Sequence, residues 1–236
     1  MQFISFASSS RGNCYLLKSN DAQPLLIEAG LPIKQLRDKL REHGISLSNL
    51  AGCLVSHEHQ DHAKAVKDLL LHGVDCYMSK GTAETLEVDY HHRVHPLYLD
   101  MTEGIQLWRA IPFPMEHDAT EPFGFFIRHE KETLLFIPDT SYILNRFQGI
   151  TMIAVECNMI SDILNKNIQE GYLPPIVGKR VRRNHMSLEN LKAFLMANDL
   201  SRCREIWLLH LSDGNSNEAR MIKEIQETTG IPVHAA

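Results

Sequence analysis

Short apolar runs recur along the chain and are separated by glycine, proline, asparagine and serine. The runs are rich in aliphatic, aromatic and β-branched residues, as is typical of buried β-strands. They cover residues 1–7, 13–19, 24–30, 50–56, 74–80, 103–113, 123–130, 132–139, 151–157 and 204–210. The pattern predicts a protein with many short strands.

Four other segments carry apolar residues at helical spacing. In residues 32–44 these positions are Ile33, Leu36 and Leu40, and Gly44 is placed to end the helix. The other three segments are residues 63–73, residues 187–199 with Ser187 as the expected N-cap, and residues 217–230 before a last short strand. We find no internal repeat, low-complexity segment or linker. We therefore expect residues 1–236 to form one α/β domain.

Composition narrows the function classes only slightly. The formal net charge is −5, so contact with nucleic acid would require a local basic patch. The five cysteines are scattered and form no CxxC pair, as is typical of reduced thiols. The first residues lack the features of a signal peptide, and no run has the length of a membrane span. These features favour a soluble, cytoplasmic protein.

The sequence HEHQDH, residues 57–62, concentrates metal-binding groups between a predicted strand and a predicted helix. The HExxH pattern of zinc proteases does not apply, because Asp61 stands where the second histidine is needed. In an extended segment His57 and His59 point the same way, whereas Asp61 and His62 project differently. The loop is therefore suited to offer two ligands to one metal ion and two to another, and the alternative is a solvated polar loop.

Three further candidate ligands each follow an apolar run. They are His117, Asp139 and His210. Imidazole and carboxylate groups at strand ends are usual ligands of Zn²⁺ or Mn²⁺. A single histidine at a strand end is more often a polar cap, but the cluster with three partners favours a metal site. The histidines of HHRVH, which are His91, His92 and His95, have no carboxylate partner in this pattern, and we assign them to a surface strand.

The order of SSSRGNCYLL, LLIEAG, HEHQDH, FPMEHDA, IPDT, ECN and HLSDGNSN resembles the metallo-β-lactamase superfamily, in its YycJ/WalJ-like branch of metal-dependent nucleases. The resemblance covers essentially the whole chain. It implies an αββα sandwich, in which two mixed β-sheets are flanked by helices. It also implies two divalent ions, Zn²⁺ or Mn²⁺, and a hydroxide between them that attacks phosphate.

The resemblance also implies a ligand assignment. One metal would be held by His57, His59 and His117, and the other by Asp61, His62 and His210. Asp139 would bridge the two ions. Departures from the family pattern are Glu28 in place of an aspartate, Met159 in place of a histidine, and the sequence around His185. We expect Glu28 to hydrogen-bond within the metal loop and not to ligate a metal.

Candidate catalytic and substrate-binding residues follow from the same comparison of motifs. Asp61 and His185 are the catalytic candidates, and His185 would bind phosphate or protonate the leaving oxygen; a solvent-exposed histidine is the alternative. The sequence GKRVRRNH predicts a basic loop that either contacts phosphates or is only a solvated surface. The substrate-binding candidates are Ser9, Asn13, Asn158, Lys179, Arg182 and Asn215. For Ser9 and Asn13 the alternative is a plain hairpin turn, and Asn158 and Asn215 are equally typical turn residues.

Two classes of enzyme remain open after these arguments. The first is a phosphodiesterase, most consistent with a DNA exonuclease, with DNA favoured over RNA. The second is a hydrolase of a small substrate such as a cyclic nucleotide, an ester, a thioester or a lactam. A binding module with an inactive site is a third reading, which the full ligand set argues against.

Overall fold

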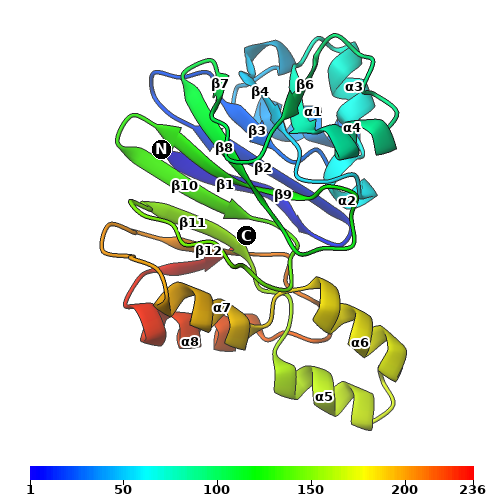
Figure 1. Ribbon diagram of the computed structural model, residues 1–236, viewed down its shortest axis with the longest axis vertical. Helices are drawn as coiled ribbons and strands as arrows, with labels where there is room; N and C mark the ends of the chain where they lie inside the picture. Colours follow the sequence, from blue (N-terminus) through cyan, green and yellow to red (C-terminus); the bar gives the residue numbers. More distant parts are fainter. The chain divides into compact units, whose positions relative to one another are not determined.

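The computed structural model describes residues 1–236, and its strands form two sheets that each contain parallel and antiparallel pairs (Figure 1). This arrangement confirms the expected fold class of two mixed sheets flanked by helices. The chain divides into two compact units. The first unit comprises Met1–Pro114 and Ala119–Lys131, and the second comprises Met115–Asp118 and Glu132–Ala236. The expectation of one domain stays a prediction.

The first unit contains a six-stranded sheet in the order β1-β2-β3-β4-β5-β6. Its strands are β1 (Gln2–Ser9), β2 (Gly12–Lys18), β3 (Leu25–Ile27), β4 (Gly52–Leu54), β5 (Cys76–Ser79) and β6 (Val94–Leu97). The pairs from β1 to β3 are antiparallel, and those from β3 to β6 are parallel. The unit also holds the antiparallel strands β7 (Glu103–Ile105), β8 (Trp108–Pro114) and β9 (Phe123–His129).

Helices of the first unit gather beside the parallel strands (Figure 1). They are α1 (Ile33–Glu42), the 3₁₀ turn η1 (Leu47–Asn49), α2 (Gln60–Ala63), α3 (Val66–Leu71) and α4 (Lys80–Thr85). The apolar stripe of α1 buries Leu36 and Leu40 in the same core as Leu26 and Cys53. Burial of this stripe, rather than helix propensity, fixes α1 on the sheet.

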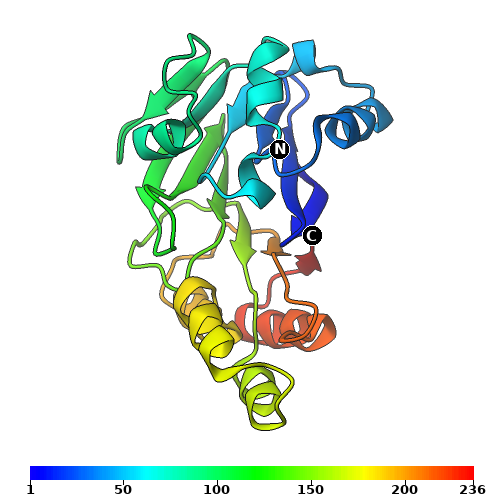
Figure 2. The ribbon, with the colours of Figure 1, turned by 90° about the vertical axis from the view of Figure 1, so that its right-hand side faces the viewer.

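The second unit is built on parallel strands in the order β10-β11-β12-β13. Their bounds are β10 (Glu132–Ile137), β11 (Met152–Glu156), β12 (Ile206–Leu209) and β13 (Val233–Ala235). The helices are α5 (Ser161–Gln169), α6 (Pro175–Asn184), α7 (Leu188–Met196) and α8 (Glu218–Thr229). Side-chain caps begin α7 at Ser187, as predicted, and α8 at Asn217. Helices α7 and α8 lie side by side next to these strands (Figures 1 and 2).

Helices α5 and α6 form a hairpin that extends away from the parallel strands of the second unit (Figures 1 and 2). A Cβ atom on Gly178 of α6 would lie 2.4 Å from Cδ1 of Ile168 on α5, so a larger residue here would require the Ile168 side chain to move. The prediction of a basic loop at residues 178–185 was wrong, because residues 175–184 are helical. Pro175 occupies the first turn of α6, where a missing N–H costs nothing.

Most other elements match the sequence pattern. All ten apolar runs contain strands, but residues 103–113 hold two, since Gln106 turns the chain with φ 53° between β7 and β8. The segment 63–73 is also divided, with Ala63 ending α2 and Val66 beginning α3. Of the three histidines assigned to a surface strand, His95 lies in β6 at the end of its sheet, with its Nε2 atom 3.3 Å from Oδ1 of Asp75. His91 and His92 lie in the turn before β6, so the assignment was wrong for these two. None of the helices combines the length and the apolar character that crossing a membrane requires.

An ion pair in the first unit predicts a pH-dependent stability. The Nε2 atom of His129 lies 2.9 Å from Oδ1 of Asp21, and its Nδ1 atom lies 3.3 Å from the Leu107 carbonyl oxygen. Burial alone would lower the pKa of His129, but hydrogen bonds to Asp21 and Leu107 raise it above its usual value. Protonation of His129 therefore stabilises the folded state relative to the unfolded state.

Because the folded-state pKa of His129 is raised, this stabilisation is fully present below the unfolded pKa and is lost as pH rises through the folded pKa. The unfolding free energy of the parent, relative to Asp21→Asn, should therefore decline as pH rises above about 6.5, the ordinary pKa of histidine. Urea unfolding of both proteins at a series of pH values measures the difference. A difference that stays constant with pH would contradict the prediction.

Candidate metal centre

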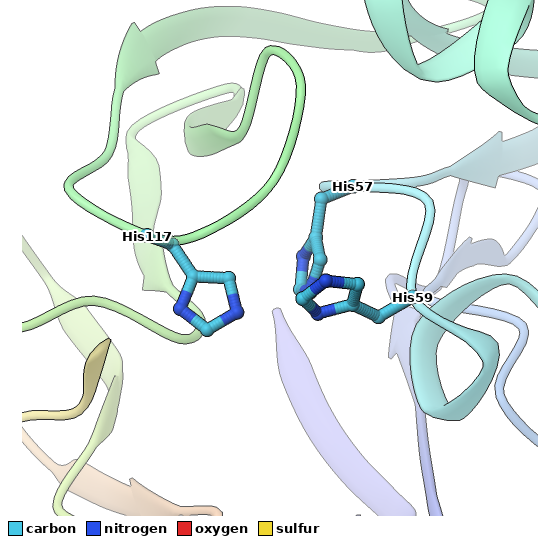
Figure 3. A group of neighbouring side chains, drawn as sticks. All are labelled: His57, His59 and His117. Atoms are coloured by element: carbon cyan, nitrogen blue, oxygen red, sulfur yellow. The ribbon is translucent and has the colours of Figure 1, made fainter. Parts of the chain in front are cut away.

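The loop after β4 brings three histidines of the first unit together. The ring centroids of His57 and His59 are 4.7 Å apart, and those of His57 and His62 are 4.1 Å apart. Figure 3 shows the imidazoles of His57 and His59 close together on this loop, and His117 on the loop after β8. His57 and His62 are 1% and 2% exposed, so this is not a solvated polar loop.

Neighbouring side chains hold these imidazoles in place. The Oγ atom of Ser56 lies 2.8 Å from Nδ1 of His57. The side-chain amide of Asn13 lies 3.0 Å from Nε2 of His62, and it donates to the backbone carbonyl of Asp61 at 3.3 Å. Hydrogen bonds of this kind orient metal-ligating groups and fix their tautomers.

Glu28 supports the loop from the end of β3. Its Oε2 atom accepts a hydrogen bond from the Ser56 backbone N–H at 3.3 Å and lies 3.6 Å from Nδ1 of His62. The expected hydrogen bond is confirmed at Ser56, and the expectation that Glu28 does not ligate a metal stays a prediction. The residue is fully buried and has φ 63°, a conformation that residues other than glycine adopt rarely. Backbone strain of this kind is often found at functional sites.

Gly30 allows the chain after β3 to approach residues 57–62, which we call the ligand loop. A Cβ atom at this position would lie 1.7 Å from the carbonyl oxygen of Asp61 and 2.6 Å from the backbone nitrogen of Asn13. The adjacent Ala29 donates its N–H to the carbonyl of His62 at 2.7 Å. The position of Asp61 and His62 therefore depends on a backbone contact that tolerates no side chain.

Four titratable residues of the second unit form a compact cluster. Asp139, Glu156, His185 and His210 each offer a ligand atom, and these atoms lie within 4.8 Å of one another. Asp139 follows β10, Glu156 ends β11, and His210 follows β12. The strands are parallel, so their carboxyl ends lie at one edge, where α/β proteins commonly place their sites.

Glu156 is the centre of this cluster and was missed by the sequence analysis. Its Oε1 atom lies 2.5 Å from Nδ1 of His185 and 3.2 Å from Nδ1 of His210. Its Oε2 atom accepts backbone N–H groups from Thr140 at 2.8 Å and Met186 at 3.0 Å. A usable signal existed, since Glu156 is a carboxylate at the end of the apolar run MIAVE, as Asp139 follows LLFIP.

The charges in this cluster depend on one another. Burial alone would lower the pKa of His210, but the carboxylates of Asp139 and Glu156 raise it to about 10. The pKa of His185 is also raised, because Glu156 outweighs the effect of burial. Two buried carboxylates thus need positive charge nearby. Imidazole nitrogens and carboxylate oxygens in a buried cluster are a donor set that fits a divalent ion such as Zn²⁺ or Mn²⁺.

His117 belongs to the second unit and is hydrogen-bonded to the end of α6. Its Nδ1 atom lies 2.9 Å from the Asn184 carbonyl oxygen and therefore donates to it, while its Nε2 atom lies 3.9 Å from Oδ2 of Asp139. Burial lowers the pKa of His117. The resulting neutral imidazole, with Nδ1 protonated, is the form that ligates a metal through Nε2.

The predicted substrate-binding residues occupy different environments. Asn13 is 1% exposed and is hydrogen-bonded to the ligand loop, and Asn158 donates its side-chain amide to the His210 carbonyl at 2.9 Å. Asn215 accepts a hydrogen bond from Asn167 at 3.0 Å. Ser9 ends β1 before the expected tight turn to β2. Substrate contact by these residues stays a prediction, as it does for Lys179 and Arg182 on α6.

Comparison with known proteins identifies the family. A family model described as a β-lactamase superfamily domain matches residues 24–210. The chain belongs to this superfamily. The chain is 27% identical over 250 residues to exodeoxyribonuclease YycJ of Bacillus anthracis, covering all of this chain and 93% of that protein. It is also 27% identical over 235 residues to exodeoxyribonuclease WalJ of Streptococcus pneumoniae, covering 94% and 84% of the two chains.

Solved structures support the fold. The metallo-β-lactamase fold protein YhfI of Bacillus subtilis has a TM-score of 0.76 at 16% identity, covering 99% of this chain and 95% of that one. Zn²⁺-bound PqqB of Methylobacterium extorquens has a TM-score of 0.72 at 13% identity, with 100% and 98% covered. The chain is a metal-dependent hydrolase of the metallo-β-lactamase fold, and it is similar to YycJ and WalJ along nearly its whole length.

The contact at Gly30 generates a prediction about metal affinity. Gly30→Ala should lower the affinity for Zn²⁺ by about 10-fold or more, because the added methyl displaces the backbone of Asp61. Competition with a chromophoric chelator measures this affinity. Gly104→Ala is the matched control, since its Cβ would meet nothing closer than 3.6 Å. Equal Zn²⁺ affinity in the two variants would rule out the proposed dependence on Gly30.

Proposed function

We propose that this hydrolase is a phosphodiesterase that cleaves DNA from a strand end. The observation that carries the proposal lies in the second unit, where α6 brings exposed cations next to a group of buried titratable side chains. We call this group, which is Asp139, Glu156, His185 and His210, the strand-end cluster. Asn184 and His185 at the end of α6 bond to His117 and Glu156, and Arg183 precedes them directly. The exodeoxyribonuclease names of the relatives YycJ and WalJ support the same substrate class.

The proposed cofactors are two divalent ions, Zn²⁺ or Mn²⁺. We propose that one is ligated by His57, His59 and His117 and the other by Asp61, His62 and His210, with Asp139 shared between them. Such ions lower the pKa of water and stabilise charge on attacking and leaving oxygens. Asp61 is thus proposed to act in catalysis as a ligand.

His185 is proposed as the group that protonates the leaving oxygen. Glu156 accepts from its Nδ1 atom at 2.5 Å, which orients the ring and stabilises the imidazolium. Burial alone would lower the pKa of His185, but Glu156 raises it above its usual value and so favours the protonated ring. With Nδ1 bound to Glu156, the proton that leaves is the one on Nε2.

The proposal also covers the type of nucleic acid and the cellular location. DNA is favoured over RNA because both curated relatives are named as exodeoxyribonucleases. A cytoplasmic location agrees with the five cysteines, all of which are free thiols.

Metal content and substrate range test the proposal directly. Protein purified without chelator should hold two divalent ions per chain and should release nucleotides from DNA, while Asp139→Ala should hold fewer ions and lose turnover. Elemental analysis and a panel of DNA, RNA, cyclic nucleotide, thioester and lactam substrates provide the measurements. Near-zero metal content after incubation with Zn²⁺ or Mn²⁺, or turnover of only the non-phosphate substrates, would overturn it.

The role of His185 predicts a dependence on the leaving group. His185→Asn should slow DNA cleavage by about 10²–10⁴-fold, because an alkoxide leaving group needs a proton. The same variant should change the hydrolysis of bis(p-nitrophenyl) phosphate much less, since p-nitrophenolate leaves without one. Comparing kcat for the two substrates in both proteins provides the measurement, with metal content checked in parallel. An equal loss on both substrates would show that His185 acts in some other way.

A further inference from the structure

One face of α6 presents an apolar side chain among three cations. Ile176, Lys179, Arg180 and Arg183 are spaced at i, i+3, i+4 and i+7, so they share one side of the helix. All four are exposed, and they line a surface cavity of about 320 Å³. We call these four residues the α6 face.

The cavity adjoins the strand-end cluster of the second unit. Asp118 and Asn184 complete its lining. Arg180 pairs with Asp118 at 3.5 Å, and Asp118 directly follows His117 in the chain. Asn184 accepts a hydrogen bond from His117, and His185 comes next in sequence. A ligand on the α6 face would therefore lie close to His117, a proposed metal ligand, and His185, the proposed proton donor.

The other side of α6 is used for packing. Gly178 meets Ile168 of α5, and the guanidinium of Arg182 donates to the side-chain oxygen of Asn165 on α5. Arg182 is therefore directed at the hairpin partner and does not line the cavity. The sequence GKRVRR does not show which of its cations contacts α5 and which of them line the cavity.

The chemistry of the α6 face fits an unpaired nucleic-acid strand. Three cations against the single carboxylate of Asp118 favour a polyanion such as a phosphodiester backbone. Ile176 is 79% exposed within this cationic surface. An exposed apolar side chain beside cations suits the face of an unstacked base, which a paired duplex does not present.

We infer that the α6 face binds the phosphates and a base of an unpaired DNA end and so directs the adjoining phosphodiester towards the metal centre. This inference rests on the proposed function, because it takes DNA as the substrate. It adds a substrate-positioning surface, with Lys179, Arg180 and Arg183 as phosphate contacts and Ile176 as a base contact.

Binding measurements on metal-loaded protein test the charge contribution. The ligand is a fluorescent single-stranded oligonucleotide with phosphorothioate linkages, and its Kd is measured at several salt concentrations. The variant Lys179→Gln, Arg180→Gln, Arg183→Gln should weaken binding and reduce the slope of log affinity against log salt by about 2, at about 0.7 for each phosphate contact. Arg182→Gln removes a cation from the same helix and should change the slope by much less.

A second pair of variants tests the base contact without changing charge. Ile176→Ser should weaken binding of the single strand and of a duplex with an unpaired overhang, but should leave binding of a blunt duplex unchanged. Val177→Ser is the matched control, because Val177 is exposed but does not line the cavity. Elemental analysis of each variant should give the same metal content as the parent, which shows that the metal centre is intact.

The outcomes separate this inference from the proposed function. If the parent cleaves DNA and the triple variant binds and cleaves it with the parental salt dependence, the α6 face is not a binding surface and the function stands. If the parent binds single strands through the α6 face but cleaves no DNA, the inference stands and the function falls. Equal effects of Ile176→Ser and Val177→Ser would overturn the base contact.

Discussion

The cost of burying carboxylates is the constraint on which this site depends. Asp139 and Glu156 are 4% and 0% exposed, and an isolated buried carboxylate is strongly unfavourable. The protein meets the cost with imidazoles and backbone N–H groups, since Glu156 contacts His185, His210, Thr140 and Met186. The same concentration of negative charge attracts divalent cations. Structural support and metal affinity thus have one electrostatic origin.

Close backbone approaches position the ligand loop of the first unit. Gly30 contacts the Asp61 carbonyl at a distance that excludes a Cβ atom, and Asn13 bonds to both Asp61 and His62. Glu28 turns the chain with positive φ so that its carboxylate reaches Ser56 and His62. The histidines of this loop are therefore held by two segments that precede it in the sequence, and little freedom is left to be lost when a metal binds.

Three consecutive residues at the end of α6 connect the proposed substrate surface to the chemistry. Asn184 accepts from His117, His185 bonds to Glu156, and the Met186 N–H donates to Glu156. A shift of α6 would therefore change the orientation of a proposed ligand and of the proposed acid together. Gly178 contributes to this geometry without touching the centre, because it packs α6 against Ile168 of α5.

The sequence by itself determined the strands, four helical segments and the strand-end positions of His57, Asp139 and His210, because hydrophobic periodicity and ligand spacing are local properties. It also determined that Glu28 would hydrogen-bond at the ligand loop. Only the tertiary structure decided that Glu156 joins Asp139 and His210, since three parallel strands distant in sequence must first align their carboxyl ends. It likewise decided that residues 175–184 are helical and that Arg182 faces α5 while Lys179, Arg180 and Arg183 face the cavity. The order of cations in a sequence does not show which of them face solvent, because the helix and the element packed against it decide where each side chain points.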